Sequence, residues 1–183
     1  MWATDPRHRA ITVVAVSAPE RTLLLMRHAK SDYPDGVGDH DRPLAARGVR
    51  EAALAGDWIR ANAPAVDAVL CSSATRTRQT LARTGIDADV RYDDDLYDST
   101  PGTVIRLVNT VPDDVTTLLV VGHEPTTSML ALTLADPDHG DMEAAERISA
   151  KYPTSAVTVL RVSQPWSRLE PHSATLTAFH VPR

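Results

Sequence analysis

Three short runs of large apolar residues constrain the fold of this chain more than any other feature. They occupy residues 23–26, 66–71 and 116–122, and each is shorter than a typical buried helix. Such runs are typical of strands buried on both faces, as in a parallel sheet covered by helices. Ligands bind beyond the carboxyl ends of such strands, so the residues that follow each run are candidates for a functional site.

Helical patterns lie between these strands. An apolar stripe at helical spacing predicts a helix over residues 44–62, and further helices are expected at 75–84, 103–110 and 126–135. A weaker strand is expected near Val90. Because strands and helices alternate, we predict an α/β fold with a largely parallel sheet and helices on both of its faces.

The C-terminal part of the chain has a different pattern. Residues 156–162 and 174–181 are predicted strands with no helix between them, and they could form an antiparallel edge of the sheet. The segment "DPDHGD" at 136–141 is interpreted as a polar turn, because it has no regular spacing of metal ligands.

The length of 183 residues favours one domain, which we place at residues 22–183, after an N-terminal extension at 1–21. The extension resembles a signal peptide only weakly, because its apolar run is short and Pro19 follows the only small-residue cleavage candidate. Residues 11–16 suggest an extra edge strand instead. No apolar run in the sequence reaches the ~20 residues of a membrane span.

The charge balance favours a small molecule or a protein as the partner. The chain has 19 Lys and Arg against 24 Asp and Glu, a formal net charge of -5, which provides no basic surface for nucleic acid or for a membrane. The single cysteine excludes an internal disulfide and fits a reducing compartment, so we expect a cytoplasmic protein.

All three strong strands lead to basic residues. The first ends in Arg27 and His28, the second leads to Arg76 in "CSSATRTRQT", and the third leads to His123 in "VVGHEP". Guanidinium groups match phosphate oxygens in pairs and imidazoles add donors. Helix N-termini after two of these strands add a further attraction for anions. These residues therefore predict a pocket for a dianionic group.

Four motifs together, "LLLMRHA", "LAARGVREA", "SSATRTRQT" and "VVGHEP", resemble the histidine phosphatase superfamily, and within it the SixA-type phosphohistidine phosphatases. The resemblance extends over about residues 22–135. It implies a phosphoglycerate mutase-like three-layer sandwich with a mostly parallel central sheet. The family usually has glycine where Ala29 stands, but SixA-type members commonly differ there, so this difference concerns the subfamily rather than activity.

The resemblance also implies the roles of the basic residues. His28 would be the nucleophile that becomes phosphorylated, Arg27 and Arg76 would hold the phosphoryl oxygens, and His123 would donate to the same group. A neutral imidazole is nucleophilic at physiological pH, and a covalent intermediate divides one difficult displacement into two easier ones. No metal or other cofactor is expected, because Arg and His supply the positive charge.

The expected substrate is a phosphorylated protein that carries phosphohistidine. A small phosphorylated metabolite is the alternative, which would make the protein a phosphomonoesterase. A phosphate-binding module without activity is a third reading, and the complete set of arginines and histidines argues against it.

Asp98 in "DDDLYDST" is the candidate general acid, on the spacing that the family's phosphomonoesterases imply, with Asp94 and Asp95 as rivals. An acid is needed most when an ester oxygen leaves. The imidazole of phosphohistidine needs less help, so the sequence leaves open that no carboxylate is essential.

Other candidate residues have a simpler structural interpretation. Arg78 is interpreted as a structural arginine of its helix, and His40, between Asp39 and Asp41, as part of a solvated loop rather than a metal site. Cys71 is not spaced from either arginine as in cysteine-dependent phosphatases, so we interpret it as an inert buried thiol. The remaining candidates are interpreted as edge-strand or surface residues, His172 and His180, and as a core residue, Trp58.

Overall fold

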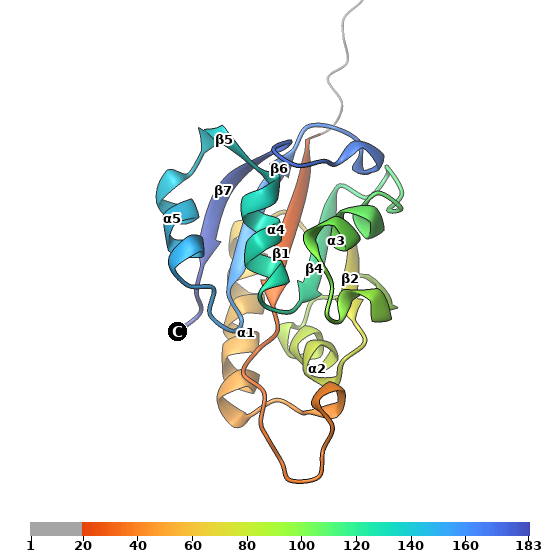
Figure 1. Cartoon of the computed structure of the whole chain (residues 1–183), viewed down its shortest axis with the longest axis vertical. Coiled ribbons are helices and arrows are strands. Elements are labelled where there is room, and N and C mark those ends of the chain that lie inside the picture. The colour runs from red at the N-terminus through yellow and green to blue at the C-terminus, as the bar shows by residue number, and fades with distance from the viewer. Residues whose placement is uncertain (1–19) are drawn as a thin grey trace, which may run out of the picture.

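The computed structural model of the chain describes residues 20–183. Over these residues the chain forms a seven-stranded sheet in the order β3-β2-β4-β1-β6-β7-β5 (Figure 1). The strands are β1 Arg21–Arg27, β2 Ala68–Ser72, β3 Asp89–Asp93, β4 Thr117–Gly122, β5 Ala135–Gly140, β6 Val157–Val162 and β7 Ala174–His180. The helices are α1 Ala46–Asn62, α2 Thr75–Thr84, α3 Pro101–Val108, α4 Thr126–Leu134 and α5 Met142–Ala150, with short 3₁₀ helices η1 Asp39–Asp41, η2 Asp94–Leu96 and η3 Trp166–Arg168. The strand expected at 11–16 lies outside the described residues.

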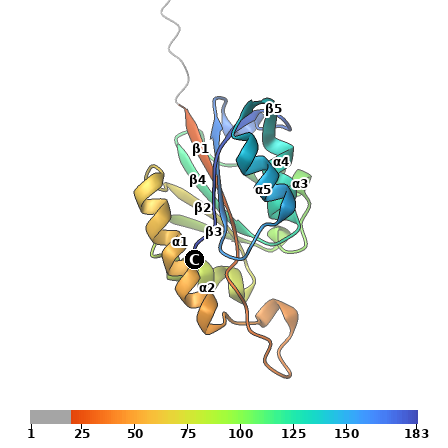
Figure 2. The ribbon, with the colours of Figure 1, turned by 90° about the vertical axis from the view of Figure 1, so that its left-hand side faces the viewer.

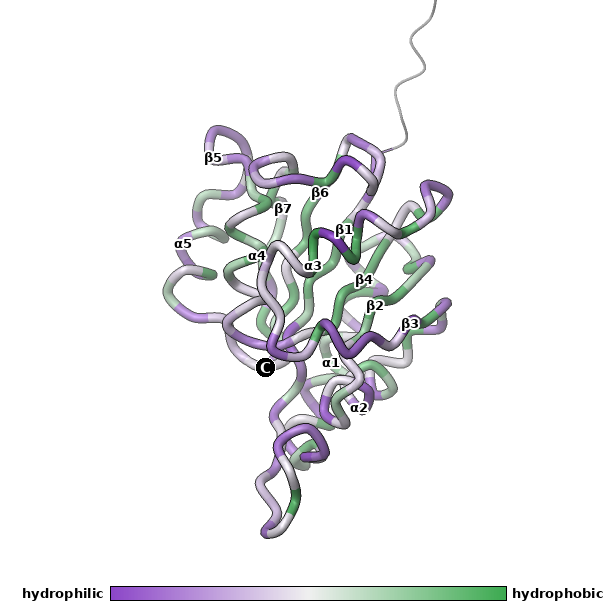
Figure 3. The backbone as a smooth tube through the Cα atoms, turned by 45° about the vertical axis from the view of Figure 1, so that its right-hand side comes forward, coloured by the Kyte–Doolittle hydropathy of each residue, from purple (hydrophilic) through white to green (hydrophobic). Residues whose placement is uncertain are grey.

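Helices cover both faces of the sheet, as the sequence predicts. α1 and α2 lie on one face, and α3, α4 and α5 lie on the other (Figure 2). Successive side chains of β1 alternate between the two resulting cores, with Leu23 and Leu25 in one and Leu24 and Met26 in the other. Because the middle of β1 is buried on both sides, residues 23–26 form an unbroken apolar run, and Figure 3 shows the hydrophobic centre of the sheet. The α/β three-layer sandwich is confirmed.

Most of the sheet is parallel. β1 pairs in parallel with β4, and β2 pairs in parallel with both β3 and β4. β6 is antiparallel to β1 and to β7, so the antiparallel pairing expected of the last two predicted strands is confirmed. β5 pairs in parallel with β7 and forms the outer edge on that side.

Two elements in the C-terminal half were not expected. The segment at 136–141 was predicted to be a polar turn, but most of it belongs to β5, which pairs with β7 through Ala135 and Gly140. This edge strand is largely exposed, so burial imposes no apolar alternation on its sequence. The helix α5 follows at once, with Asp141 as its N-cap, whose side chain accepts a hydrogen bond from the Ala144 N–H at 2.9 Å.

α1 packs very closely against the segment that follows β1. A Cβ atom on Gly48 would lie 2.1 Å from the carbonyl oxygen of Lys30, so only glycine allows this approach. Leu44 pairs with Ser31 in an isolated bridge, and for that reason the helix begins at Ala46, slightly later than predicted.

Among residues 20–183, no helix is both long and apolar enough to cross a membrane.

Candidate active site

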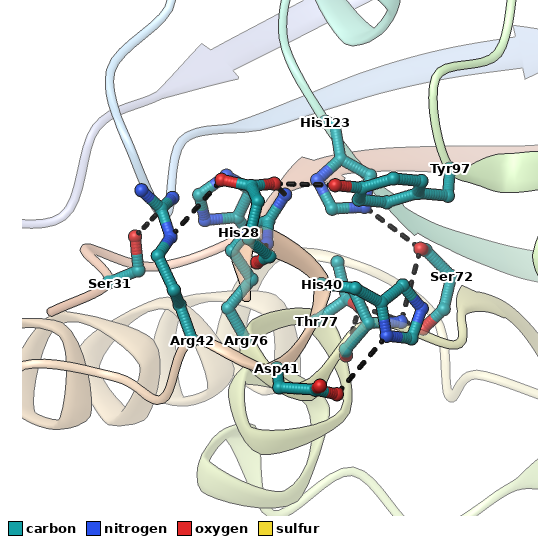
Figure 4. Close-up of polar contacts among 12 residues, drawn as sticks. His28, Ser31, His40, Asp41, Arg42, Ser72, Arg76, Thr77, Tyr97 and His123 are labelled. Carbon is teal, nitrogen blue, oxygen red and sulfur yellow. Dashed lines mark hydrogen bonds and ion pairs between the residues drawn. The ribbon is translucent and has the colours of Figure 1, made fainter. Parts of the chain in front are cut away.

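Three neighbouring strands, β1, β2 and β4, bring the predicted basic residues to one edge of the sheet. Arg27 ends β1 and His28 follows it, Arg76 lies in the first turn of α2 just after β2, and His123 follows β4. All four line one open cavity of about 280 Å³. The His28 and His123 rings lie 5.2 Å apart between centroids, with the Arg76 side chain beside them (Figure 4). The other lining residues are Lys30, Ser31, Tyr33, Asp39, Arg42, Asp98, Glu124 and Thr154.

His28 is held with one ring nitrogen directed at the backbone. Its Nδ1 lies 2.7 Å from the carbonyl oxygen of Ala29, and because a carbonyl can only accept, Nδ1 carries the proton and Nε2 keeps its lone pair. The pKa of His28 is lowered to about 4, mainly by burial, and the positive charges of Arg76 and Arg27 contribute to this lowering. His28 is therefore neutral at physiological pH, the state in which an imidazole is a nucleophile.

Arg76 is buried and oriented by the segment before α1. Its Nη1 donates to the carbonyl oxygen of Asp39 at 2.6 Å, and its Nη2 donates to Asp39 Oδ2 at 3.1 Å. The hydroxyl of Thr80 donates to the Arg76 carbonyl at 2.6 Å and accepts from the Ala29 N–H at 2.8 Å. This one threonine therefore connects the helix that carries Arg76 to the backbone beside His28.

Arg27 is held from the opposite side by the loop that follows α5. Its Nη1 donates to the carbonyl oxygen of Tyr152 at 2.6 Å, and the Tyr152 hydroxyl donates to the carbonyl oxygen of Leu25 at 2.9 Å. Burial lowers the pKa of Arg27, and the negative charge of Glu124 opposes this effect. This support could not be expected from the sequence, because no pattern there indicated α5.

His123 contacts β2 through its ring. Its Nε2 lies 2.8 Å from Ser72 Oγ, and the ring packs edge-on against Tyr97 at 5.3 Å between centroids. The pKa of His123 is lowered to about 3, mainly by burial, and His28 and Arg76 contribute to this lowering. His123 is therefore also neutral at physiological pH, and it acts as a hydrogen-bonding group rather than as a cation.

Asp39 lies in an exposed segment, as the sequence predicts, but it also lines the cavity, which the sequence did not indicate. Its Oδ2 accepts from Arg76 and, at 2.5 Å, from the Tyr97 hydroxyl, while its Oδ1 lies 3.3 Å from Arg42 Nε. The hydrogen bond from Tyr97 is the main reason why the pKa of Asp39 is lowered. His40 stays exposed beside it. Within residues 20–183, no group of three or more His, Cys, Asp or Glu could hold a metal ion.

Two further carboxylates line the cavity. Asp98, the candidate acid, is exposed there and has a left-handed backbone with φ of 50°. Its rivals Asp94 and Asp95 belong to η2 and are not among the lining residues. Glu124 was not considered in the sequence analysis, although its position directly after His123 is a signal that could have identified it.

The other interpreted residues lie outside the cavity. Arg78 is exposed, with its guanidinium 4.9 Å from the centroid of the Tyr92 ring. Cys71 is fully buried, and burial raises the pKa of its thiol to about 12, which makes it unreactive. Trp58, which the sequence predicts as a core residue, packs against the core but is only half-buried, and its ring stacks on His180 at 4.5 Å between centroids.

Comparisons with known proteins agree with this geometry. The model of the histidine phosphatase superfamily (branch 1) matches residues 23–108. An uncharacterized protein of Mycobacterium tuberculosis (strain H37Rv) is 66% identical over 158 residues, which cover 86% of this chain and 100% of the relative. The solved structure of a proposed phosphohistidine phosphatase SixA from Nakamurella multipartitia is 41% identical, with a TM-score of 0.82, and the match covers 91% of this chain and 98% of that one. A similarly described protein from Agrobacterium tumefaciens is 26% identical, with a TM-score of 0.73 and coverage of 88% and 99%.

Proposed function

Because the chain belongs to the histidine phosphatase superfamily, we propose that it hydrolyses phosphohistidine in proteins through a covalent intermediate on His28. The family supports phosphatase chemistry in general. The identity of the substrate, the roles of the individual residues and the independence from metal are the parts that we propose.

One observation carries this proposal. Arg27 Nε, Arg76 Nε and His123 Nδ1 are buried polar atoms with no hydrogen-bond partner within residues 20–183, and all three residues line the cavity that contains His28. A buried donor without an acceptor destabilises the fold, and such atoms therefore need a specific explanation. A phosphoryl group presents several oxygens at once, and bound next to His28 Nε2 it would accept from all three donors.

The reaction then has two steps. The lone pair of His28 Nε2 attacks phosphorus while the bond to the leaving group breaks, and Arg27, Arg76 and His123 stabilise the charge on the phosphoryl oxygens. When the Ser72 hydroxyl donates a hydrogen bond to His123 Nε2, the proton of this neutral histidine lies on Nδ1, and this N–H can donate a hydrogen bond to a phosphoryl oxygen. Water then attacks phosphorus, the bond to Nε2 breaks, and inorganic phosphate and neutral His28 are released.

The open cavity favours a protein substrate. The cavity of about 280 Å³ communicates with solvent, so a histidine ring on another protein can reach it. The similarity to the Nakamurella protein, which is described as a phosphohistidine phosphatase, supports the same choice. Asp98 favours the second candidate, a phosphomonoesterase for a small metabolite, because it lies at the cavity where it could protonate an ester oxygen.

The decisive experiment measures kcat/KM for a phosphohistidine-bearing protein and for a panel of small phosphomonoesters, all in the presence of a chelator. We expect turnover in chelator and a preference for phosphohistidine of about a hundredfold or more. A preference for one of the esters would support the phosphomonoesterase instead. Absence of turnover on every substrate would support a phosphate-binding module, and activity restored only by added metal would contradict the metal-independent mechanism.

A further inference from the structure

The three carboxylates that line the cavity differ in what holds them. Asp39 is occupied by Arg76, Arg42 and the Tyr97 hydroxyl. Asp98 is exposed and makes no hydrogen bond or ion pair within residues 20–183. Glu124 lies between these two cases, because its side chain is half-buried and accepts a single hydrogen bond. Only Glu124 therefore combines a fixed position with a free acceptor.

The hydrogen bond of Glu124 uses only one of its two oxygens. Oε2 accepts from the backbone N–H of Ser128 in α4 at 3.0 Å, and Oε1 has no hydrogen-bond partner among residues 20–183. The charge of Glu124 also acts on Arg27, since it opposes the lowering of the pKa of that arginine by burial. Glu124 is thus a carboxylate next to the proposed phosphoryl site, with one oxygen available to a bound substrate.

A phosphohistidine substrate offers a partner for that oxygen. When the second nitrogen of its ring is protonated, the electron pair of the breaking P–N bond goes to the first nitrogen, and a neutral imidazole leaves. The proton stays on the second nitrogen throughout, so no proton has to be transferred to the leaving group. A carboxylate that accepts a hydrogen bond from this N–H favours the protonated ring.

On the basis of the proposed function, we propose that Glu124 accepts a hydrogen bond from the protonated imidazole of the substrate and so selects phosphohistidine over phosphate esters. An alkoxide or phenolate leaving group carries no positive charge and gains nothing from this contact. Glu124 is then the specificity-determining residue of the site, and Asp98 is the residue that serves esters.

A purely structural role for Glu124 predicts a different result. If Glu124 only oriented Arg27 or the start of α4, its loss would weaken binding of the phosphoryl group, which every substrate shares. Activity would then fall by the same factor on phosphohistidine and on esters. The ratio of the two activities therefore separates selection of the leaving group from support of the site.

The test compares Glu124→Gln with Glu143→Gln, which changes an exposed glutamate of α5 outside the cavity. The glutamine keeps an oxygen that can accept from Ser128 and removes the charge. For each variant, kcat/KM is measured on a phosphohistidine-bearing protein and on 4-nitrophenyl phosphate, from mildly acidic to mildly alkaline pH. For Glu124→Gln we expect a loss on phosphohistidine at least about tenfold greater than the loss on the ester, and a gap that widens as pH rises, because the ring loses its proton. Glu143→Gln should leave the ratio unchanged.

Equal losses on both substrates, or an unchanged ratio at every pH, would overturn this inference while the proposed function stands. A wild-type protein that hydrolyses esters but not phosphohistidine would overturn the proposed function, and this inference with it.

Discussion

The cavity has a floor and a rim, and the chain supports them in different ways. The floor consists of Arg27, His28, Arg76 and His123, and the rim consists of Lys30, Tyr33, Asp98 and Glu124. Floor residues lie at or just after the ends of central strands. His28 is only 8% exposed, Arg76 and His123 are also buried, and Arg27 is half-buried, whereas Tyr33 on the rim is 65% exposed. The floor is therefore fixed by the sheet, and the rim is supplied by the connecting segments.

This difference in support corresponds to a difference in chemistry. In the proposed reaction the floor would face the phosphoryl group, which is the same in every substrate, and the rim would face the leaving group, which is not. A change in the floor should lower activity on all substrates together. A change in the rim should alter the preference among them, so the substrate dependence of each variant tests the distinction.

The largest loss is expected for His28→Ala. Because Nε2 of His28 is the only atom proposed to form the covalent intermediate, turnover should be abolished on every substrate. Rapid quenching of the wild-type protein at alkaline pH should trap an acid-labile phosphoryl group on His28, identified by mass spectrometry. A label found on Cys71 or on a serine would refute the mechanism.

Alanine substitution of Arg76 should have the next largest effect. Removal of one preorganised donor to the phosphoryl oxygens lowers kcat/KM by roughly two to three powers of ten, and the loss should be similar on phosphohistidine and on esters. Arg27→Ala and His123→Ala should behave in the same way. Arg78→Ala is the matched control from the same helix, and a larger loss at Arg78 than at Arg76 would show that the wrong arginine was assigned.

The elements that carry the floor could be predicted from the sequence because burial determines their composition. β1 is enclosed by helices on both faces, so its apolar run is unbroken, and α2 was predicted with its observed bounds. β5 could not be predicted in this way, because it is an exposed edge strand joined to β7 through only two paired positions. Its polar sequence has the composition of a turn.

Position relative to the buried strands also explains which cavity-lining residues could be predicted from the sequence. Three of them lie just after the ends of buried strands, where local sequence and topology together determine the position of a side chain: His28, Arg76 in the first turn of α2, and His123. Asp39 reaches the site through contacts with Arg76 and Tyr97, which are far from it in the sequence and outside any pattern that local spacing can predict. Rim and second-layer residues of this kind become visible only in three dimensions.

Asp98→Asn tests the rim, and its effect should depend on the leaving group. An alkoxide leaves as a strong base unless an acid protonates it, so hydrolysis of an alkyl phosphate should fall by about two powers of ten. The loss on an aryl phosphate should be smaller, because phenolates leave more readily, and the loss on phosphohistidine should be smallest. Equal losses on all three would assign Asp98 to structure or binding, and no loss on any would transfer the role to Asp94, to Asp95 or to no carboxylate.

The smallest effect is expected for Tyr97→Phe, because Tyr97 does not line the cavity and contacts it through His123 and Asp39. The ring would still pack edge-on against His123, and Asp39 would keep its two contacts with Arg76, so only one partly exposed hydrogen bond is lost. We expect kcat/KM to fall by less than about tenfold, equally on esters and on phosphohistidine. The pKa of Asp39, measured by NMR titration, should rise towards its ordinary value, because the Tyr97 hydroxyl is the main cause of its lowering. Tyr92→Phe on β3 is the control, and it should change neither quantity. A loss as large as that of Arg76→Ala would mean that Arg76 depends on Asp39 and Tyr97 for its position, and the floor would then have to include the segment before α1.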